Sequence, residues 1–166
     1  MRPRRPEHLR KFDYLGFHAY FLTFCTYERA RLFASDAVVD LVLLQISRAA
    51  DECGFAVLAY CFMPDHVHLL VEGMSDASDC KAFISRAKQY SGFYYANAHR
   101  ARLWQRYSFE HVLRDNEKSE TAARYILENP VTAGLVERIE DYPYLGSLEW
   151  PRSALLEWLY PPTSNT

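Results

Sequence analysis

The sequence of 166 residues is short of several features that define other classes of protein. No apolar run approaches the roughly 18 residues that a membrane-spanning helix needs, so we expect no contact with a membrane. The basic start of the chain is not followed by an apolar stretch and does not predict a signal peptide. Internal repeats and low-complexity stretches are also missing. Apolar residues (49%) and charged residues (24%) stand in the proportions of an ordinary soluble domain.

Cysteine is scarce and irregularly spaced. The four cysteines are Cys25, Cys53, Cys61 and Cys80, and no two of them form a CxxC pair. Without a secretory signal, such cysteines are expected to be buried thiols rather than disulfides or zinc ligands. The sequence therefore predicts a protein of the reducing cytoplasm.

The formal net charge is only −2, which taken alone argues against a nucleic-acid partner. The charges are unevenly distributed, however. Residues 1–11 carry five basic side chains against one acid, and residues 81–109 carry six basic side chains and no acid. Residues 137–166 carry five acids and two arginines. This pattern predicts two basic segments, and suggests the hypothesis that the acidic tail folds over the basic face and restrains it.

Aromatic residues are interleaved with the cations of the acid-free segment. Cations can follow the phosphates of a single strand while rings stack on its bases. The alternative is that most of these rings fill the core between a helix and the sheet. We expect the cations to contribute collectively to DNA binding through Arg86, Lys88, Arg100, Arg102 and Arg106.

Apolar periodicity and turn residues predict an alternating order of strands and helices. Strands are expected over residues 16–27, 55–62, 66–71 and 107–114, and a turn at Met63-Pro64-Asp65 makes a hairpin of the middle two. One helix is expected between Ser35 and Gly54, a second over 78–98, and a third from Asp115 or Asn116 to Pro130. The order β-α-β-β-α-β followed by a helix predicts an α+β, ferredoxin-like fold, with helices on one face of an antiparallel sheet.

His66-Val67-His68 is the first motif that could carry chemistry. Alternate residues of a strand share a face, so both imidazoles would point the same way with a spacing that suits one metal ion. The alternative is a pair of hydrogen-bonded histidines on a half-exposed strand.

Tyr125 and Asn129 form the second candidate. They are four residues apart, so a helix places both on one face. Asn129 precedes Pro130 and is expected at the frayed end of the helix, from where its side chain could turn toward a neighbouring site. The alternative is that Tyr125 is a core aromatic residue with its hydroxyl group at the surface.

Together these segments resemble a known family. The run Tyr60–Val71 (YCFMPDHVHLLV) resembles the histidine-hydrophobe-histidine (HUH) signature of single-tyrosine transposases. The later segments stand in the order expected of the REP-associated tyrosine transposases: Leu103–Gln105, His111–Asp115, Ala123–Ile126 and Asn129–Val136. The resemblance covers residues 14–148. It implies a transposase domain over residues 1–148, including a basic N-terminal arm, and a C-terminal tail over 149–166.

The resemblance also implies a role for each motif. His66, His68 and Asn129 would bind a divalent metal, Mg²⁺ or Mn²⁺. Tyr125 would attack a phosphodiester of single-stranded DNA at hairpin-forming palindromic repeats, giving a 5′-phosphotyrosine and a free 3′-hydroxyl. Two imidazoles and one amide oxygen leave coordination positions open, which suits these ions better than a closed zinc site.

The length of the segment 141–166 resembles the REP-associated branch, and favours a monomer over a homodimer. Two other functions stay open from the residues alone. The first is a non-catalytic, single-stranded nucleic-acid-binding domain of the same fold. The second is a metal-dependent hydrolase in which Tyr125 only positions water.

Overall fold

The computed structural model describes residues 12–163. The basic arm predicted within residues 1–11 lies outside this range. The predicted order of the first seven regular elements is confirmed, and a short fifth strand and a last helix follow them. The elements are β1 (Ala19–Cys25), the 3₁₀ turn η1 (Tyr27–Arg29), α1 (Asp36–Cys53), β2 (Phe55–Met63), β3 (His66–Gly73), α2 (Cys80–His99), β4 (Phe109–Val112), α3 (Ser119–Thr132), the 3₁₀ turn η2 (Ile139–Asp141), β5 (Leu145–Gly146) and α4 (Arg152–Leu159).

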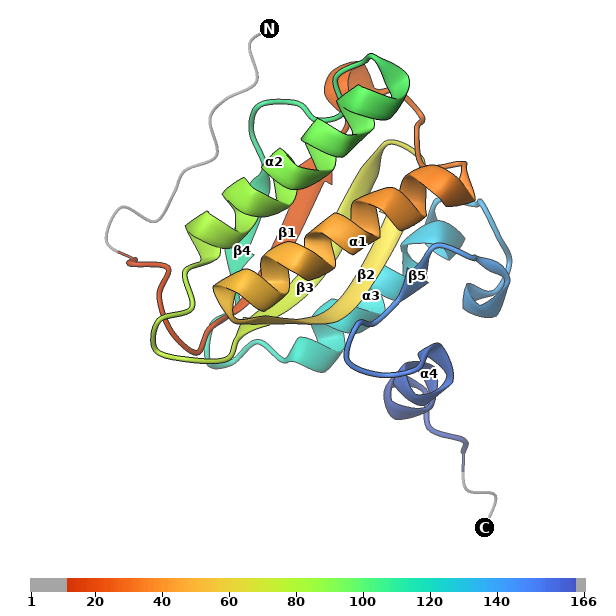
Figure 1. Ribbon diagram of the computed structural model, residues 1–166. Coiled ribbons are helices and arrows are strands. Elements are labelled where there is room, and N and C mark those ends of the chain that lie inside the picture. Colours follow the sequence, from red (N-terminus) through yellow and green to blue (C-terminus); the bar gives the residue numbers. More distant parts are fainter. Residues whose placement is uncertain (1–11, 164–166) are drawn as a thin grey trace, which may run out of the picture.

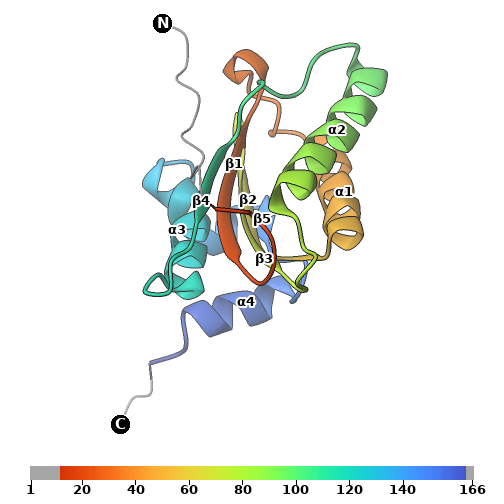
Figure 2. The same cartoon turned by 90° about the vertical axis from the view of Figure 1, so that its left-hand side faces the viewer.

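The strands form one antiparallel sheet in the order β4-β1-β3-β2-β5 (Figure 1). Strands β2 and β3 make the predicted hairpin. Helices α1 and α2 lie side by side over one face of the sheet, and α3 lies on the opposite face (Figure 2). The ferredoxin-like α+β fold expected from the sequence is therefore confirmed. Within residues 12–163, no helix combines the length and the apolar character needed to cross a membrane.

The larger core fills the space between the sheet and helices α1 and α2. Val38, Val42 and Ile46 recur at helical spacing and turn the apolar stripe of α1 toward the sheet. Gly54 ends this helix as predicted, in the left-handed region with φ 73°, where a residue with a side chain would be strained. This core covers one face of the sheet, and a smaller cluster packs on the other face.

The smaller cluster joins the opposite face of the sheet to α3 and α4. Ile126 and Leu127 of α3 pack with Leu155 and Leu159 of α4. Helix α4 therefore lies on the α3 side of the sheet, away from α2 (Figures 1 and 2). The hypothesis that the acidic tail covers the basic segment is wrong for its described part, because the apolar residues of α4 bind it to the other face.

Helix α3 differs from its prediction at both ends. It begins at Ser119 after Lys118, later than the predicted cap, and it runs through Pro130 to Thr132. Proline removes only one donor here, and the backbone N–H of Ala133 still donates to the carbonyl of Asn129 at 2.9 Å. Asn129 consequently lies inside the last helical turns, and its expected position at a frayed end is wrong.

The segment between α2 and β4 is fastened to α2 by a buried hydrogen bond. The indole Nε1–H of Trp104 donates to Oγ of Ser91 at 2.8 Å, and the Ser91 hydroxyl donates to the carbonyl of Ala87. Ser91 is fully buried and Trp104 is 5% exposed. Loss of the hydroxyl would leave the indole N–H buried without its partner.

We expect Ser91→Ala to lower the free energy of unfolding by about 1–3 kcal/mol, the usual cost of an unsatisfied buried donor. Urea denaturation measures this difference. Ser85→Ala, an exposed serine on the same helix, is the matched control and should leave the free energy of unfolding nearly unchanged. Equal losses in the two variants would contradict a role for the Trp104 hydrogen bond.

Candidate active site

The two histidines of the HVH motif lie on β3 and share one face of the sheet. Leu70, two residues beyond the second histidine, packs in the cluster with α3. Val67, Leu69 and Val71 instead lie in the core beneath α1 and α2. Because strand residues alternate between faces, both imidazoles belong to the α3 side. The predicted common face is confirmed.

A continuous chain of polar contacts runs through the histidines. Arg29 Nε donates to Asp65 Oδ2 at 2.9 Å, and the other carboxylate oxygen of Asp65 contacts Nδ1 of His66 at 2.7 Å. Nε2 of His66 lies 3.1 Å from Nε2 of His68, whose Nδ1 lies 2.8 Å from Oγ1 of Thr23. Both outer nitrogens are thereby held, and the two Nε2 atoms face each other.

Burial and charge set the protonation of this chain. Burial lowers the pKa of His68 to about 3, assisted by the nearby His66 and Arg29, so its imidazole is neutral near pH 7. Burial alone would raise the pKa of Asp65, but hydrogen bonds from His66 and Arg29 bring it below its usual value. In the tautomer of His66 that carries its hydrogen on Nδ1, Asp65 accepts this hydrogen and Nε2 keeps a lone pair.

The histidine pair has the geometry of two neighbouring ligands of one ion. Two ligands at right angles, each 2.0–2.1 Å from an octahedral ion, stand about 2.9 Å apart, close to the 3.1 Å between the Nε2 atoms. The contact from Asp65 to His66 is the outer support usual for a metal-binding imidazole. Within residues 12–163, no group of three His, Cys, Asp or Glu side chains could hold a metal. A third protein ligand would thus be of another type, such as the amide of Asn129.

Tyr125 stands over this pair from α3. Its neighbours Ile126 and Leu127 are buried against the sheet and hold the helix in place. The Tyr125 ring centroid lies 6.3 Å from that of His68 and 5.7 Å from that of Phe21, yet the residue remains 60% exposed. The alternative of a core aromatic residue with its hydroxyl group at the surface is wrong, because 60% of Tyr125 is exposed. Asn129 is half-buried and follows one helical turn later.

Other tyrosines that could compete as nucleophile lie elsewhere. Tyr90, Tyr94 and Tyr95 belong to α2, on the far side of the sheet from the histidines. The hydroxyl of Tyr90 donates to the carboxylate of Glu52 on α1, which raises the Tyr90 pKa. Of these three tyrosines and Tyr125, only Tyr125 is thus brought by the fold to the histidine pair.

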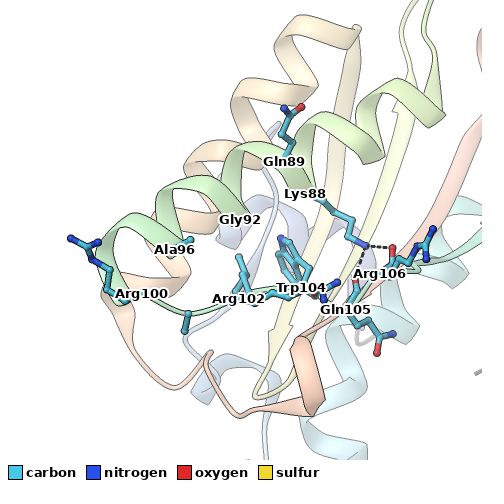
Figure 3. Close-up of a pocket in the computed structure, with 11 residues that line it drawn as sticks. Lys88, Gln89, Gly92, Ala96, Arg100, Arg102, Trp104, Gln105 and Arg106 are labelled. Carbon is cyan, nitrogen blue, oxygen red and sulfur yellow. Dashed lines mark hydrogen bonds between the residues drawn. The ribbon is translucent and has the colours of Figure 1, made fainter. Parts of the chain in front are cut away.

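Four of the five predicted DNA-binding cations line a cavity of about 730 Å³ between α2 and the segment that follows it (Figure 3). Arg100, Arg102 and Arg106 are exposed. The Arg102 guanidinium lies 4.7 Å from the centre of the Tyr27 ring, and its Nε donates to the carbonyl of Trp104. Trp104, which is 5% exposed, is the aromatic residue that lines the cavity beside these cations.

The other two cations have different surroundings. Nζ of Lys88 donates to the carbonyl oxygens of Gln105 and Arg106 (Figure 3). It also donates to Oγ of Ser108. Burial lowers the Lys88 pKa to about 8, with Arg102 adding to this effect. Arg86 lies outside the cavity, and its Nη1 is 3.5 Å from the carboxylate of Glu52.

The end of β1 connects this basic cavity to the histidines. Cys25 pairs with His66 on one side, and on the other side its carbonyl accepts from the backbone N–H of Gln105. The next residue, Thr26, forms a bridge with Trp104. The cavity and the histidine pair consequently lie at the same end of the sheet.

Sequence reasoning missed three residues of this site. Asp65 was interpreted only as a turn residue, although its position directly before His66 was the available signal. Thr23 and Arg29 are brought in by the pairing of β1 with β3 and by η1. No spacing in the sequence points to these two, because their partners lie more than 30 positions away.

Stability should fall in acid because of His68. The folded-state pKa is about 3, below the usual 6.5, so stability is fully present above pH 6.5 and is lost as the unfolded chain takes up a proton that the folded chain does not. Between pH 6.5 and 5 this costs about 2 kcal/mol of unfolding free energy. Urea denaturation should show that His68→Gln removes this dependence.

His99→Gln, at an exposed histidine of α2, is the control for that measurement and should keep the pH dependence of the unchanged protein. The same dependence in His68→Gln as in the unchanged protein would contradict the assigned burial.

Comparisons with known proteins show the family of this chain. The family model described as "Transposase IS200 like" matches residues 17–129. A Haemophilus influenzae protein assigned to the REP-associated tyrosine transposases is 24% identical over 144 residues, which cover 75% of this chain and 77% of that protein.

Two solved structures share the fold. One is a REP-associated tyrosine transposase bound to a REP hairpin, with a TM-score of 0.70 and 20% identity, covering 84% of this chain and 81% of that one. The other is a Deinococcus radiodurans protein assigned as a transposase, with a TM-score of 0.51 and 23% identity, covering 74% and 96%. Because the family model spans more than half of the sequence and includes the histidines, Tyr125 and Asn129, this chain belongs to the IS200-like transposase family.

Proposed function

We propose that the protein is a metal-dependent strand transferase that cleaves single-stranded DNA beside hairpin-forming repeats, with Tyr125 as the nucleophile. The observation that carries this proposal is the position of an exposed tyrosine beside His68, a buried and neutral imidazole whose Nε2 faces that of His66. A protein that only bound DNA would need neither the paired Nε2 atoms nor the nearby phenol.

The covalent step exchanges one phosphoester bond for another and needs no external energy source. Oη of Tyr125 forms a bond to the scissile phosphorus, and the bond from phosphorus to the 3′-oxygen breaks. The phenol gives up its proton and the leaving 3′-oxygen gains one. The products are a 5′-phosphotyrosine and a free 3′-hydroxyl, and attack by a 3′-hydroxyl on the phosphotyrosine reverses the step and rejoins strands.

His66, His68 and Asn129 are the residues that would hold a divalent cation, Mg²⁺ or Mn²⁺. When bound, such a cation supplies charge that stabilises the phosphate oxygens and the leaving oxygen. The chain itself orients the pair: Asp65 and Thr23 fix the outer nitrogens, and α3 places the phenol beside them.

The basic cavity supports a DNA substrate. Arg100, Arg102 and Arg106 offer cations for phosphates, and the cavity lies at the same end of the sheet as the histidines. A solved structure with this fold belongs to a transposase bound to a REP hairpin. We therefore propose palindromic hairpin DNA as the substrate, with its single-stranded flank leading from the cavity to Tyr125.

Tyr125→Phe should abolish the covalent adduct and lower cleavage by at least about 10³-fold, because the ring remains and only the nucleophilic oxygen is lost. Labelled hairpin oligonucleotides, built from inverted repeats flanking the coding sequence, are incubated with Mg²⁺ or Mn²⁺ and resolved by denaturing electrophoresis. Tyr94→Phe, an exposed tyrosine of α2, is the control and should form the adduct normally.

Adduct in Tyr125→Phe would overturn the assignment of the nucleophile. Cleavage by the unchanged protein without any linked intermediate, even after a rapid denaturing quench, would favour the hydrolase. Hairpin binding without cleavage in any divalent cation would favour a binding protein.

We also propose that the site works within one chain, as a monomer. The Tyr125 ring already lies beside His68 of the same chain, so no partner is needed to complete the site. A mixture of Tyr125→Phe and His66→Ala proteins should then form no adduct, since each chain lacks one part. Adduct in the mixture near a quarter to half of the normal level would show exchange of the tyrosine between chains and contradict this proposal.

A further inference from the structure

A second cavity, of about 860 Å³, has Tyr125 in its lining and shares no lining residue with the basic cavity. Strands β1 and β4 form its floor through Phe21 and Phe109, and Tyr125 and the start of α3 form its wall. Figure 2 shows α3 beside the β4 edge of the sheet. The roles proposed above for the histidines and the basic residues leave this cavity without a ligand.

The cavity is lined by aromatic rings that stay open. Phe109 is 53% exposed and Tyr125 is 60% exposed. Phe21 lies between them, with its centroid 6.3 Å from that of Phe109 and 5.7 Å from that of Tyr125, each in an edge-to-face arrangement. Rings left open around a hollow offer faces on which a flat aromatic ligand can stack.

Polar groups stand at the rim. His111 Nε2 lies 2.8 Å from a carboxylate oxygen of Glu117, and Glu117 also accepts from the backbone N–H of Arg114. The hydrogen bond from His111, followed by that from Arg114, lowers the Glu117 pKa, so this carboxylate is ionised near pH 7. Lys118 also lines the cavity, so the rim carries one charge of each sign. The edge of a base could bond to Glu117, to Lys118 or to the exposed amide of Asn116.

We infer that this cavity binds the base of the nucleotide immediately 3′ of the scissile bond. The inference rests on the proposed function, because that nucleotide carries the phosphate that Tyr125 attacks and stays linked to Oη after cleavage. The same tyrosine ring forms a wall of the cavity, so the linked base reaches it without spanning any other element. The aromatic lining provides stacking, and the rim provides contacts to the base edge.

Binding of abasic oligonucleotides tests the inference without requiring cleavage. The protein carries Tyr125→Phe, which keeps the ring and removes the nucleophile, and each single-stranded position of the hairpin probe is made abasic in turn. Adding Phe109→Ala should weaken binding of the intact probe roughly 5- to 100-fold, as expected for loss of one stacked base. At one position, the abasic probe should bind equally to both proteins, because the interaction is already lost.

Two variants control this experiment. Phe93→Ala removes a ring that is 60% exposed on α2 and should not change binding. Phe109→Trp keeps an aromatic face and should restore the affinity, which separates stacking from any disturbance of β4. The position found should be the nucleotide 3′ of the cleavage site mapped from the Tyr125 adduct.

The inference would be overturned if the proteins with and without Phe109→Ala bound the intact probe equally. It would also be overturned if removing a base weakened binding by the same factor in both proteins at every position. A change of oligomeric state in Phe109→Ala, seen by sedimentation without a position-dependent abasic effect, would assign the cavity to a second copy of the chain instead. Failure of the proposed function is distinct, since it appears as a missing adduct while the abasic scan still reports on the cavity.

Discussion

The antiparallel register between β1 and β3 is the constraint on which the site depends. It places Cys25 opposite His66 and Thr23 opposite His68, and antiparallel pairing puts opposed side chains on the same face. A shift by one residue would turn both histidines into the core beneath α1 and α2. That shift is opposed by Val67, Leu69 and Val71, which fill this core. Packing on one face of the sheet therefore fixes the positions of the histidines on the other face.

The two faces of the sheet serve different purposes. Helices α1 and α2 cover their face, whereas α3 covers the Leu70 region and leaves Tyr125 exposed and His66 partly exposed. Backbone strain lies close to the histidines. Glu28 and Arg29 adopt φ of 55° and 56°, a region that is costly for residues with side chains. In this conformation Arg29 reaches both Asp65 and Sγ of Cys25, so the surrounding contacts hold the strained turn in place.

The distribution of charge explains how a chain of net charge −2 presents a basic surface. The C-terminal segment that carries five acids packs through α4 on the α3 side, while the exposed arginines of residues 100–106 gather at the loop after α2. The cations of residues 81–109 also have two different structural environments. Lys88 fastens residues 105–108 to α2, and Arg100, Arg102 and Arg106 stay exposed. Composition could not predict which cations are buried and which are exposed, because burial depends on neighbours from elsewhere in the chain.

The sequence by itself determined the order of the elements and the common face of the histidines, because apolar periods of 2 and 3.6 are local properties of the backbone. It did not determine the two-residue strand β5, which exists only through pairing with β2, or the passage of α3 through Pro130, which packing permits. Only the tertiary structure decided that Tyr125 meets His68, that Thr23 and Asp65 hold the imidazoles, and that α4 packs beside α3. None of these contacts is marked by a repeating pattern in the sequence. They follow instead from the strand register and from the packing of apolar surfaces.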